Sequence, residues 1–158
     1  MRELGRCAGC YGLERREFLR DLAAVVAGFA GVLPVNFASA LSALGEQVTY
    51  AIPGADGVTI DKEREVILAR YEESVYAFAL SCPHQKTPLR WQEADHRFQC
   101  PKHKSKFQPD GTFLEGRATR NMDRYAIRKE GTNVVVDLGT LFREDENRDG
   151  WISAVVRV

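Results

Sequence analysis

Short apolar runs separated by turn-forming residues recur along the chain from residue 48 onward. Runs rich in β-branched and aromatic residues lie at 48–52, 65–71, 74–80, 97–99, 112–114, 124–128 and 134–138. Such short, alternating runs predict strands. Glu72-Glu73 and the segment 130–133 each lie between two of these runs and predict hairpin turns. The pattern therefore predicts an all-β domain of antiparallel hairpins, closed by a last strand at 151–156.

The amino-terminal segment follows a different pattern. A pair of arginines at 15–16 precedes a Phe-Leu pair at 18–19 and an Ala- and Gly-rich apolar run at 22–33. This order is typical of a twin-arginine export signal, which bacteria use to move folded proteins across the inner membrane. Small residues at 38–40 offer a cleavage site after Ala40.

The same segment also has the length of a membrane anchor. No charged residue occurs from Leu22 to Gly45, a length that spans a bilayer as a helix, although Pro34 and Asn36 weaken that helix. A cleaved signal and a retained anchor are both left open. We expect a signal or anchor at 1–45, a globular domain at 46–158, and a location on the periplasmic side of the bacterial inner membrane.

Charge and cysteine usage exclude several classes of protein. Lys plus Arg and Asp plus Glu each total 22, so no bulk positive field points to nucleic acid. Cys7 and Cys10 form a C-x-x-C ahead of the export signal with no second such pair, and we expect neither a zinc site nor a redox pair there. His96 lies in a polar run and is expected at the surface.

Two short segments each bring together one thiol and one imidazole: Cys82-Pro83-His84 and Cys100-Pro101-Lys102-His103. Thiolates favour iron–sulfur clusters or zinc, and imidazoles favour zinc, copper or iron, so a metal centre is expected. Zinc fingers usually place like ligands together on one element, whereas here each segment has one of each. A zinc-stabilised binding module is therefore the alternative to an iron–sulfur centre.

Pro after each Cys, Ser105 after the last His, and the spacing from Phe107 to Gly111 complete the motif. Together these features resemble the Rieske iron–sulfur family, over about residues 48 to 138. The resemblance implies an antiparallel β-sandwich with a small cluster-binding subdomain at about 80–116. It also implies a 2Fe–2S cluster that transfers single electrons, with no catalytic residue of its own.

The resemblance also assigns the ligands. Cys82 and Cys100 would hold an iron that stays ferric, and His84 and His103 would hold the outer iron, which alternates between ferric and ferrous. Neutral imidazoles in place of anionic thiolates stabilise the reduced cluster and raise its potential, toward about −150 to +300 mV.

Several positions depart from the pattern of quinol-oxidising relatives. Thr87 and Lys102 stand where those proteins have the two cysteines of a bracing disulfide. Ser105 matches a serine that donates a hydrogen bond to the cluster, whereas Phe107 replaces a tyrosine that makes a similar bond. The covering loop reads Gly-Arg-Ala at 116–118 instead of Gly-Pro-Ala. We therefore expect a potential below that of those relatives.

Five basic residues fall in or beside the two ligand segments: Lys86, Arg90, Lys102, Lys104 and Lys106. They predict a positive tip that docks an acidic electron partner such as a cytochrome. The expected function is that of an exported electron-transfer protein or subunit, passing electrons from a quinol or an enzyme to such an acceptor. The alternative is the small Rieske subunit of a periplasmic molybdenum oxidase of the arsenite oxidase type.

Overall fold

The structure is a computed structural model that describes residues 45–158. The predicted export signal, the cleavage site after Ala40 and the Cys7–Cys10 pair lie outside the described residues. Within 45–158, no helix has the length and apolar character needed to cross a membrane.

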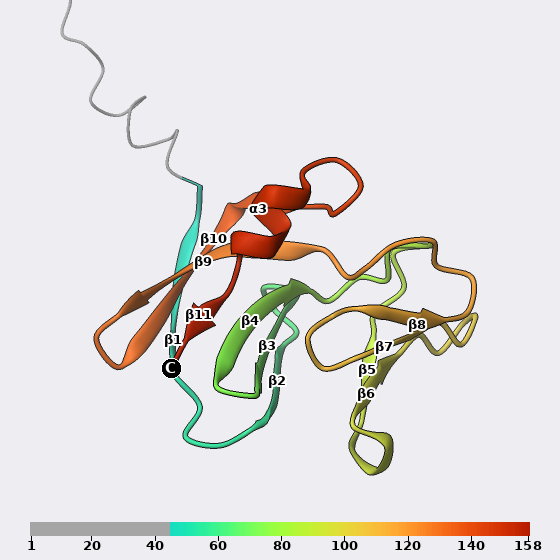
Figure 1. The fold of residues 1–158 in the computed structure, drawn as a ribbon, viewed down its shortest axis with the longest axis horizontal. Coiled ribbons are helices and arrows are strands. Elements are labelled where there is room, and N and C mark those ends of the chain that lie inside the picture. The colour runs from blue at the N-terminus through green and yellow to red at the C-terminus, as the bar shows by residue number, and fades with distance from the viewer. Residues whose placement is uncertain (1–44) are drawn as a thin grey trace, which may run out of the picture. The chain divides into compact units, whose positions relative to one another are not determined.

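A seven-stranded antiparallel sheet forms the larger part of the fold (Figure 1). Its strands follow the order β1-β10-β9-β4-β3-β2, and β11 pairs with β4. Their bounds are β1 Gln47–Ala51, β2 Gly57–Asp61, β3 Val66–Tyr71, β4 Ser74–Ala79, β9 Arg124–Glu130, β10 Asn133–Phe142 and β11 Val156–Arg157. The hairpin turns predicted at Glu72-Glu73 and at 130–133 are confirmed, because β3 pairs with β4 and β9 with β10.

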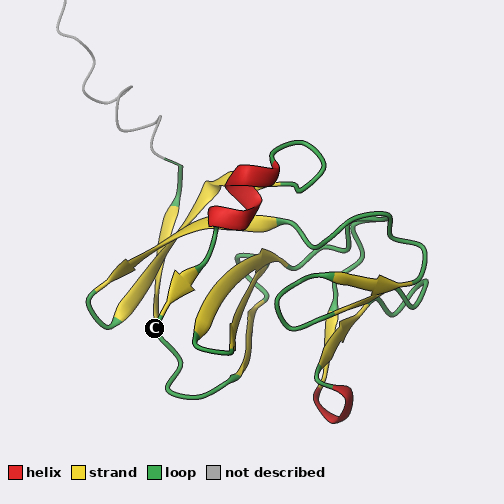
Figure 2. Cartoon of the chain, viewed as in Figure 1, coloured by secondary structure: helices red, strands yellow, loops and turns green. Residues whose placement is uncertain are grey.

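A second, four-stranded sheet is inserted between β4 and β9 (Figure 2). It contains, in this order, β5 Arg90–Gln92, β6 Arg97–Gln99, β7 Lys106–Phe107 and β8 Phe113–Glu115. A short 3-10 helix, Glu93–Asp95, joins β5 to β6. This sheet lies within the range predicted for a small subdomain, about 80–116, and the all-β antiparallel fold class is confirmed.

Strand β3 separates two hydrophobic cores because both of its faces are buried. Val66 and Leu68 point into a core shared with Val134 and Val136 of β10. Successive side chains of a strand point to opposite faces, so Ile67 and its neighbour Ala69 pack into the other core, with aromatic residues of the small subdomain. The continuous apolar run 66–69 thus builds the sandwich on one face and supports the small subdomain on the other.

The prediction of a strand at 151–156 is wrong. Residues Arg148–Ser153 form the helix α3, and only Val156–Arg157 are extended, as β11. The Asn147 side chain caps α3 by accepting a hydrogen bond from the backbone N–H of Gly150, as N-cap residues do. The Trp151 indole N–H donates to the carbonyl of Met122 at 2.7 Å. In the helix, Trp151 is the side chain that points into the protein. The alternating pattern of a strand does not predict this arrangement.

Candidate metal centre

The first ligand loop, residues 80–89, joins β4 to β5. The backbone N–H of Cys82 donates to the carbonyl of Thr87 at 2.8 Å, and the N–H of Lys86 donates back to the carbonyl of Cys82 at 2.9 Å. Lys86 has a φ of 53°, a left-handed conformation that few residues other than glycine adopt. The loop therefore closes tightly around His84.

The second ligand loop, residues 100–105, joins β6 to β7 and repeats this pattern. The N–H of Cys100 donates to the carbonyl of Ser105 at 2.8 Å, and the N–H of Lys104 donates to the carbonyl of Cys100 at 3.0 Å. Lys104 has a φ of 60°. The two loops share these backbone hydrogen bonds and a left-handed residue four positions after the cysteine, although the histidine lies two residues after the first cysteine and three after the second.

Cys82 and Cys100 form a buried thiol pair, each with 1% of its surface exposed. Burial raises the pKa of Cys82, and the neighbouring Cys100 raises it further. Burial also acts on Cys100, but hydrogen bonds from the backbone N–H groups of His103 and Lys102 outweigh it and lower the pKa of this thiol. Backbone donors at Cys100 favour the thiolate, which is the form that binds a metal.

His84 and His103 form an imidazole pair with ring centroids 4.9 Å apart and planes at 67°. The Nδ1 atoms of both rings are buried, and neither has a hydrogen-bond partner among residues 45–158. Burial, together with the nearby cation of Arg117, lowers the pKa of His103. Buried polar atoms are normally paired, so the two unpartnered Nδ1 atoms are available to bind a metal.

The donor set therefore fits an iron–sulfur cluster. It offers two buried sulfur atoms and two buried nitrogen atoms, which match two thiolate and two imidazole ligands. No three His, Cys, Asp or Glu side chains in the described part of the chain lie close enough together to surround a single ion.

The third loop, residues 116–123, joins β8 to β9 and covers the second ligand loop. Ser105 is fully buried, and its Oγ accepts hydrogen bonds from the N–H groups of Arg117 and Ala118, both at 3.0 Å. A hydroxyl oxygen has two acceptor positions and one proton. Since both acceptor positions are occupied, the proton of Ser105 is left to donate to another group.

The other residues considered in the sequence differ in how far they are buried. Phe107 is fully buried and packs edge-on against Phe113 with centroids 5.8 Å apart, so its ring is part of the core. Thr87 is half-buried, and its side chain contributes to lowering the pKa of Cys100 in the other ligand loop, an effect that the sequence did not predict. Lys102 is exposed, as is His96, whose surface position is confirmed.

The predicted positive tip is partly neutralised. Lys86 pairs with Asp123 at 3.7 Å, and Lys106 pairs with Glu115. Lys102, Lys104 and Arg90 are exposed and have no acidic partner among residues 45–158.

Arg117 adds a cation close to His103. The sequence alone did not single it out. The sequence did contain one signal for it, the charged residue in place of proline at the centre of Gly-Arg-Ala.

Comparison with known proteins agrees with the donor set. A family model for the Rieske [2Fe-2S] domain matches residues 40–126. The cytochrome b6-f complex iron-sulfur subunit of Chlorobaculum tepidum is 25% identical over 146 residues, covering 79% of this chain and 76% of that protein.

Solved structures give weaker superpositions. The plasma membrane Rieske protein PetC3 from Synechocystis PCC 6803 is 26% identical with a TM-score of 0.43, covering 51% of this chain and 83% of that one. A chain of a hyperthermophilic respiratory Complex III is 20% identical with a TM-score of 0.43, covering 78% of this chain and 96% of that one. The family match spans more than half of the sequence, and the chain belongs to the Rieske family, whose cofactor is a 2Fe–2S cluster.

Proposed function

We propose that Cys82 and Cys100 hold one iron of the cluster and that His84 and His103 hold the other. The observation that supports this assignment most directly is the pair of buried, unpartnered Nδ1 atoms next to a buried thiol pair. The bound cluster would accept and release one electron at a time, at a potential raised by its two neutral ligands. The chain's own side chains hold the cluster, shield its sulfur side from water and tune its charge.

The two sides of the donor set have different roles in this proposal. Both cysteines are excluded from solvent, whereas both histidines are partly exposed. The histidine side is therefore the place where an electron partner would approach. Lys102, Lys104 and Arg117 are exposed near it and would favour a partner with an acidic surface, with an association rate that falls as salt rises.

The proposed ligands can be tested by spectroscopy. The purified protein should show the visible and electron paramagnetic resonance spectra of a Rieske cluster. His84→Cys should shift the spectrum toward that of an all-cysteine cluster, or abolish the cluster, while His96→Ala should change neither. Loss of the cluster in His96→Ala with retention in His84→Ala would contradict the assignment.

We infer that the chain is exported and acts on the periplasmic side of the inner membrane. Residues 1–45 would be the twin-arginine signal, cleaved after Ala40 or kept as an anchor, and residues 46–158 the cluster domain. A cluster assembled in the cytosol has to cross the membrane inside a folded protein, which this export route permits. Replacing both Arg15 and Arg16 by Lys should keep the protein in the cytosol, and the mass of the mature chain decides between cleavage and anchoring.

We further propose that the chain serves as an electron-transfer subunit between a quinol-oxidising partner and an acceptor such as a cytochrome. The similarity to an iron–sulfur subunit of a cytochrome b6-f complex favours this partner over a molybdenum oxidase. Purification from native membranes under mild detergent should recover a cytochrome b-type partner. Recovery of a molybdenum subunit instead would establish the arsenite oxidase-like alternative.

A further inference from the structure

A buried carboxylate outside the donor set connects the first ligand loop to the rest of the fold. Asp123 has no exposed surface, yet three cationic side chains reach it. Arg120 donates two hydrogen bonds to it, Lys86 lies 3.7 Å away and Arg143 lies 4.0 Å away. A buried carboxylate is stable only when it is paired and hydrogen-bonded. The Asp123 carboxylate therefore needs these three cationic side chains to remain charged in the interior.

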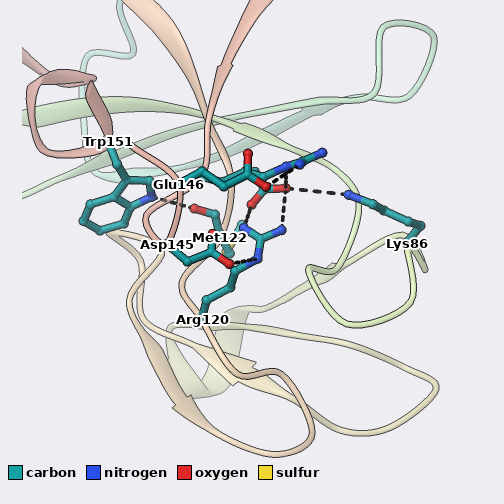
Figure 3. Close-up of polar contacts among 8 residues, drawn as sticks. Lys86, Arg120, Met122, Asp145, Glu146 and Trp151 are labelled. Atoms are coloured by element: carbon teal, nitrogen blue, oxygen red, sulfur yellow. Dashed lines mark hydrogen bonds and ion pairs between the residues drawn. The ribbon is translucent and has the colours of Figure 1, made fainter. Parts of the chain in front are cut away.

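The Asp123 carboxylate is fixed on the side of the larger sheet. The backbone carbonyl of Asp123 accepts from the N–H of Ala79 at 3.0 Å, and Arg120 is also held by Asp145 at 3.6 Å. The backbone carbonyl of Met122, the residue before Asp123, accepts a hydrogen bond from the indole N–H of Trp151. Figure 3 shows that the Lys86 side chain approaches the carboxylate with which it pairs, that of Asp123, from the side opposite Trp151. Asp123 is thus a rigid attachment point, and Lys86 is the group that attaches to it.

Lys86 belongs to the backbone ring that closes around His84, since its N–H bonds to the carbonyl of Cys82. Its counterpart Lys104 has the same left-handed backbone and the same bond to its cysteine, but no acidic partner in the described part of the chain. The second ligand loop is held differently, because Ser105 accepts two N–H groups of the third loop. Residues 116–123 therefore hold both ligand loops, through Ser105 at one end and through Asp123 at the other.

We propose that Asp123 is a positioning residue that holds the first ligand loop, and with it His84, through its ion pair with Lys86. This inference goes beyond the electron-transfer role but rests on the proposed ligands Cys82 and His84. The pair fixes a side chain four residues after the cysteine and two after the histidine. Its loss would leave only the backbone ring to keep the imidazole in place.

The test compares Lys86→Gln with the matched control Lys104→Gln in the protein as purified. Each substitution removes one positive charge at the same position of an equivalent loop, so both should lower the reduction potential to a similar extent. Only Lys86→Gln should speed amide exchange across residues 80–89, by about two- to fivefold, as expected for an ion pair with one exposed partner. It should also accelerate cluster loss to an iron chelator and change the electron paramagnetic resonance line shape.

Two further variants separate positioning from charge. Lys86→Arg keeps the ion pair and should restore wild-type exchange and line shape. Asp123→Asn should accelerate exchange in the first ligand loop, and adding Lys86→Gln should produce no further acceleration there, because the Lys86–Asp123 pair that connects Asp123 to this loop is already lost. Should Asp123→Asn fail to fold, the comparison of Lys86→Gln with Lys104→Gln decides the question.

Equal rates of amide exchange across residues 80–89 in Lys86→Gln and Lys104→Gln would overturn the proposal. It would also be overturned if Lys86→Gln and Asp123→Asn each accelerated this exchange independently, so that their effects multiplied in the double variant. The outcome is distinguishable from a failure of the proposed ligands. If the wild-type protein shows no Rieske spectrum, the ligand assignment is refuted, while amide exchange in residues 80–89 still reports whether the ion pair holds the loop.

Discussion

Gly116 lies so close to Ser105 that a Cβ atom at residue 116 would stand 2.4 Å from the Ser105 Cα. Its φ of 116° is also one that side-chain-bearing residues rarely adopt. This close approach allows the next two backbone N–H groups of the third loop to reach the buried Ser105 hydroxyl. The glycine thus links the covering loop to the second ligand loop.

Gly116→Ala should therefore destabilise the protein by more than about 2 kcal/mol, because backbone strain adds to a clash with a fixed backbone atom. Gly131→Ala is the control for strain alone, since its φ is 60° but the space around it is open; it should cost about 1 kcal/mol. Gly54→Ala, in open space at an ordinary φ, should be neutral. Chemical denaturation measures all three, and equal costs at 116 and 131 would show that the close approach is unimportant.

Ser105→Ala should lower the reduction potential. The structure leaves the Ser105 proton free to donate, and a donor to a charged cluster is worth about 1.5–3 kcal/mol, which corresponds to about 60–130 mV for one electron. Protein-film voltammetry measures the shift. Ser153→Ala, on the helix α3 far along the chain, is the control. An unchanged potential in Ser105→Ala would show that the proton points away from the cluster.

Arg124 joins the two parts of the fold. Its guanidinium lies 3.6 Å from the centroid of the Trp151 ring, and it donates to the carbonyls of Trp151 at 2.9 Å and of Asp110 at 2.7 Å. Arg124→Met should lower stability by about 2–4 kcal/mol, because a buried carbonyl and a partly buried carbonyl lose their donors. The exposed Arg128→Met should change it by less than about 0.5 kcal/mol. Thermal unfolding followed by circular dichroism measures both.

Tyr50 should make stability depend on pH in the alkaline range. Burial, with a hydrogen bond to Asp61 at 2.9 Å, raises the pKa of Tyr50 to about 12. The unfolded chain loses this proton near the ordinary value of about 10. The contribution of the folded phenol is therefore complete below pH 10 and disappears as the pH rises to 12.

The measurement is the difference in unfolding free energy between the wild type and Tyr50→Phe. The advantage of the wild type should shrink across that window, and the ultraviolet titration of the variant should lack the late-ionising tyrosine. A difference that is constant from pH 9 to pH 12 would contradict the shifted pKa.

Much of the fold followed from local sequence pattern. The hairpin of β3 and β4 was predicted because two apolar runs flank a two-residue polar turn, and β9 and β10 for the same reason. Three strands, β2, β5 and β7, were not predicted. The last two have three and two residues, and their pairing depends on partners elsewhere in the chain.

The helix α3 was assigned to the wrong class for a related reason. The run after Gly150 is apolar and suits a strand, but the Asn147 cap and the hydrogen bond from Trp151 to Met122 select the helix. The second of these contacts depends on a residue far away in sequence. Short apolar runs are ambiguous until their tertiary partners are known.

The candidate ligands can be identified without a structure, because Cys82, His84, Cys100 and His103 lie in two short segments with a specific spacing. The contacts that hold those segments in place are visible only in the folded chain. Ser105 accepts hydrogen bonds from residues 117 and 118, and Lys86 forms an ion pair with the buried Asp123. These partners are separated by many residues, and their spacing follows no periodic pattern. Ligand identity is a local chemical property, whereas the support of a ligand loop depends on which distant groups the fold brings against it.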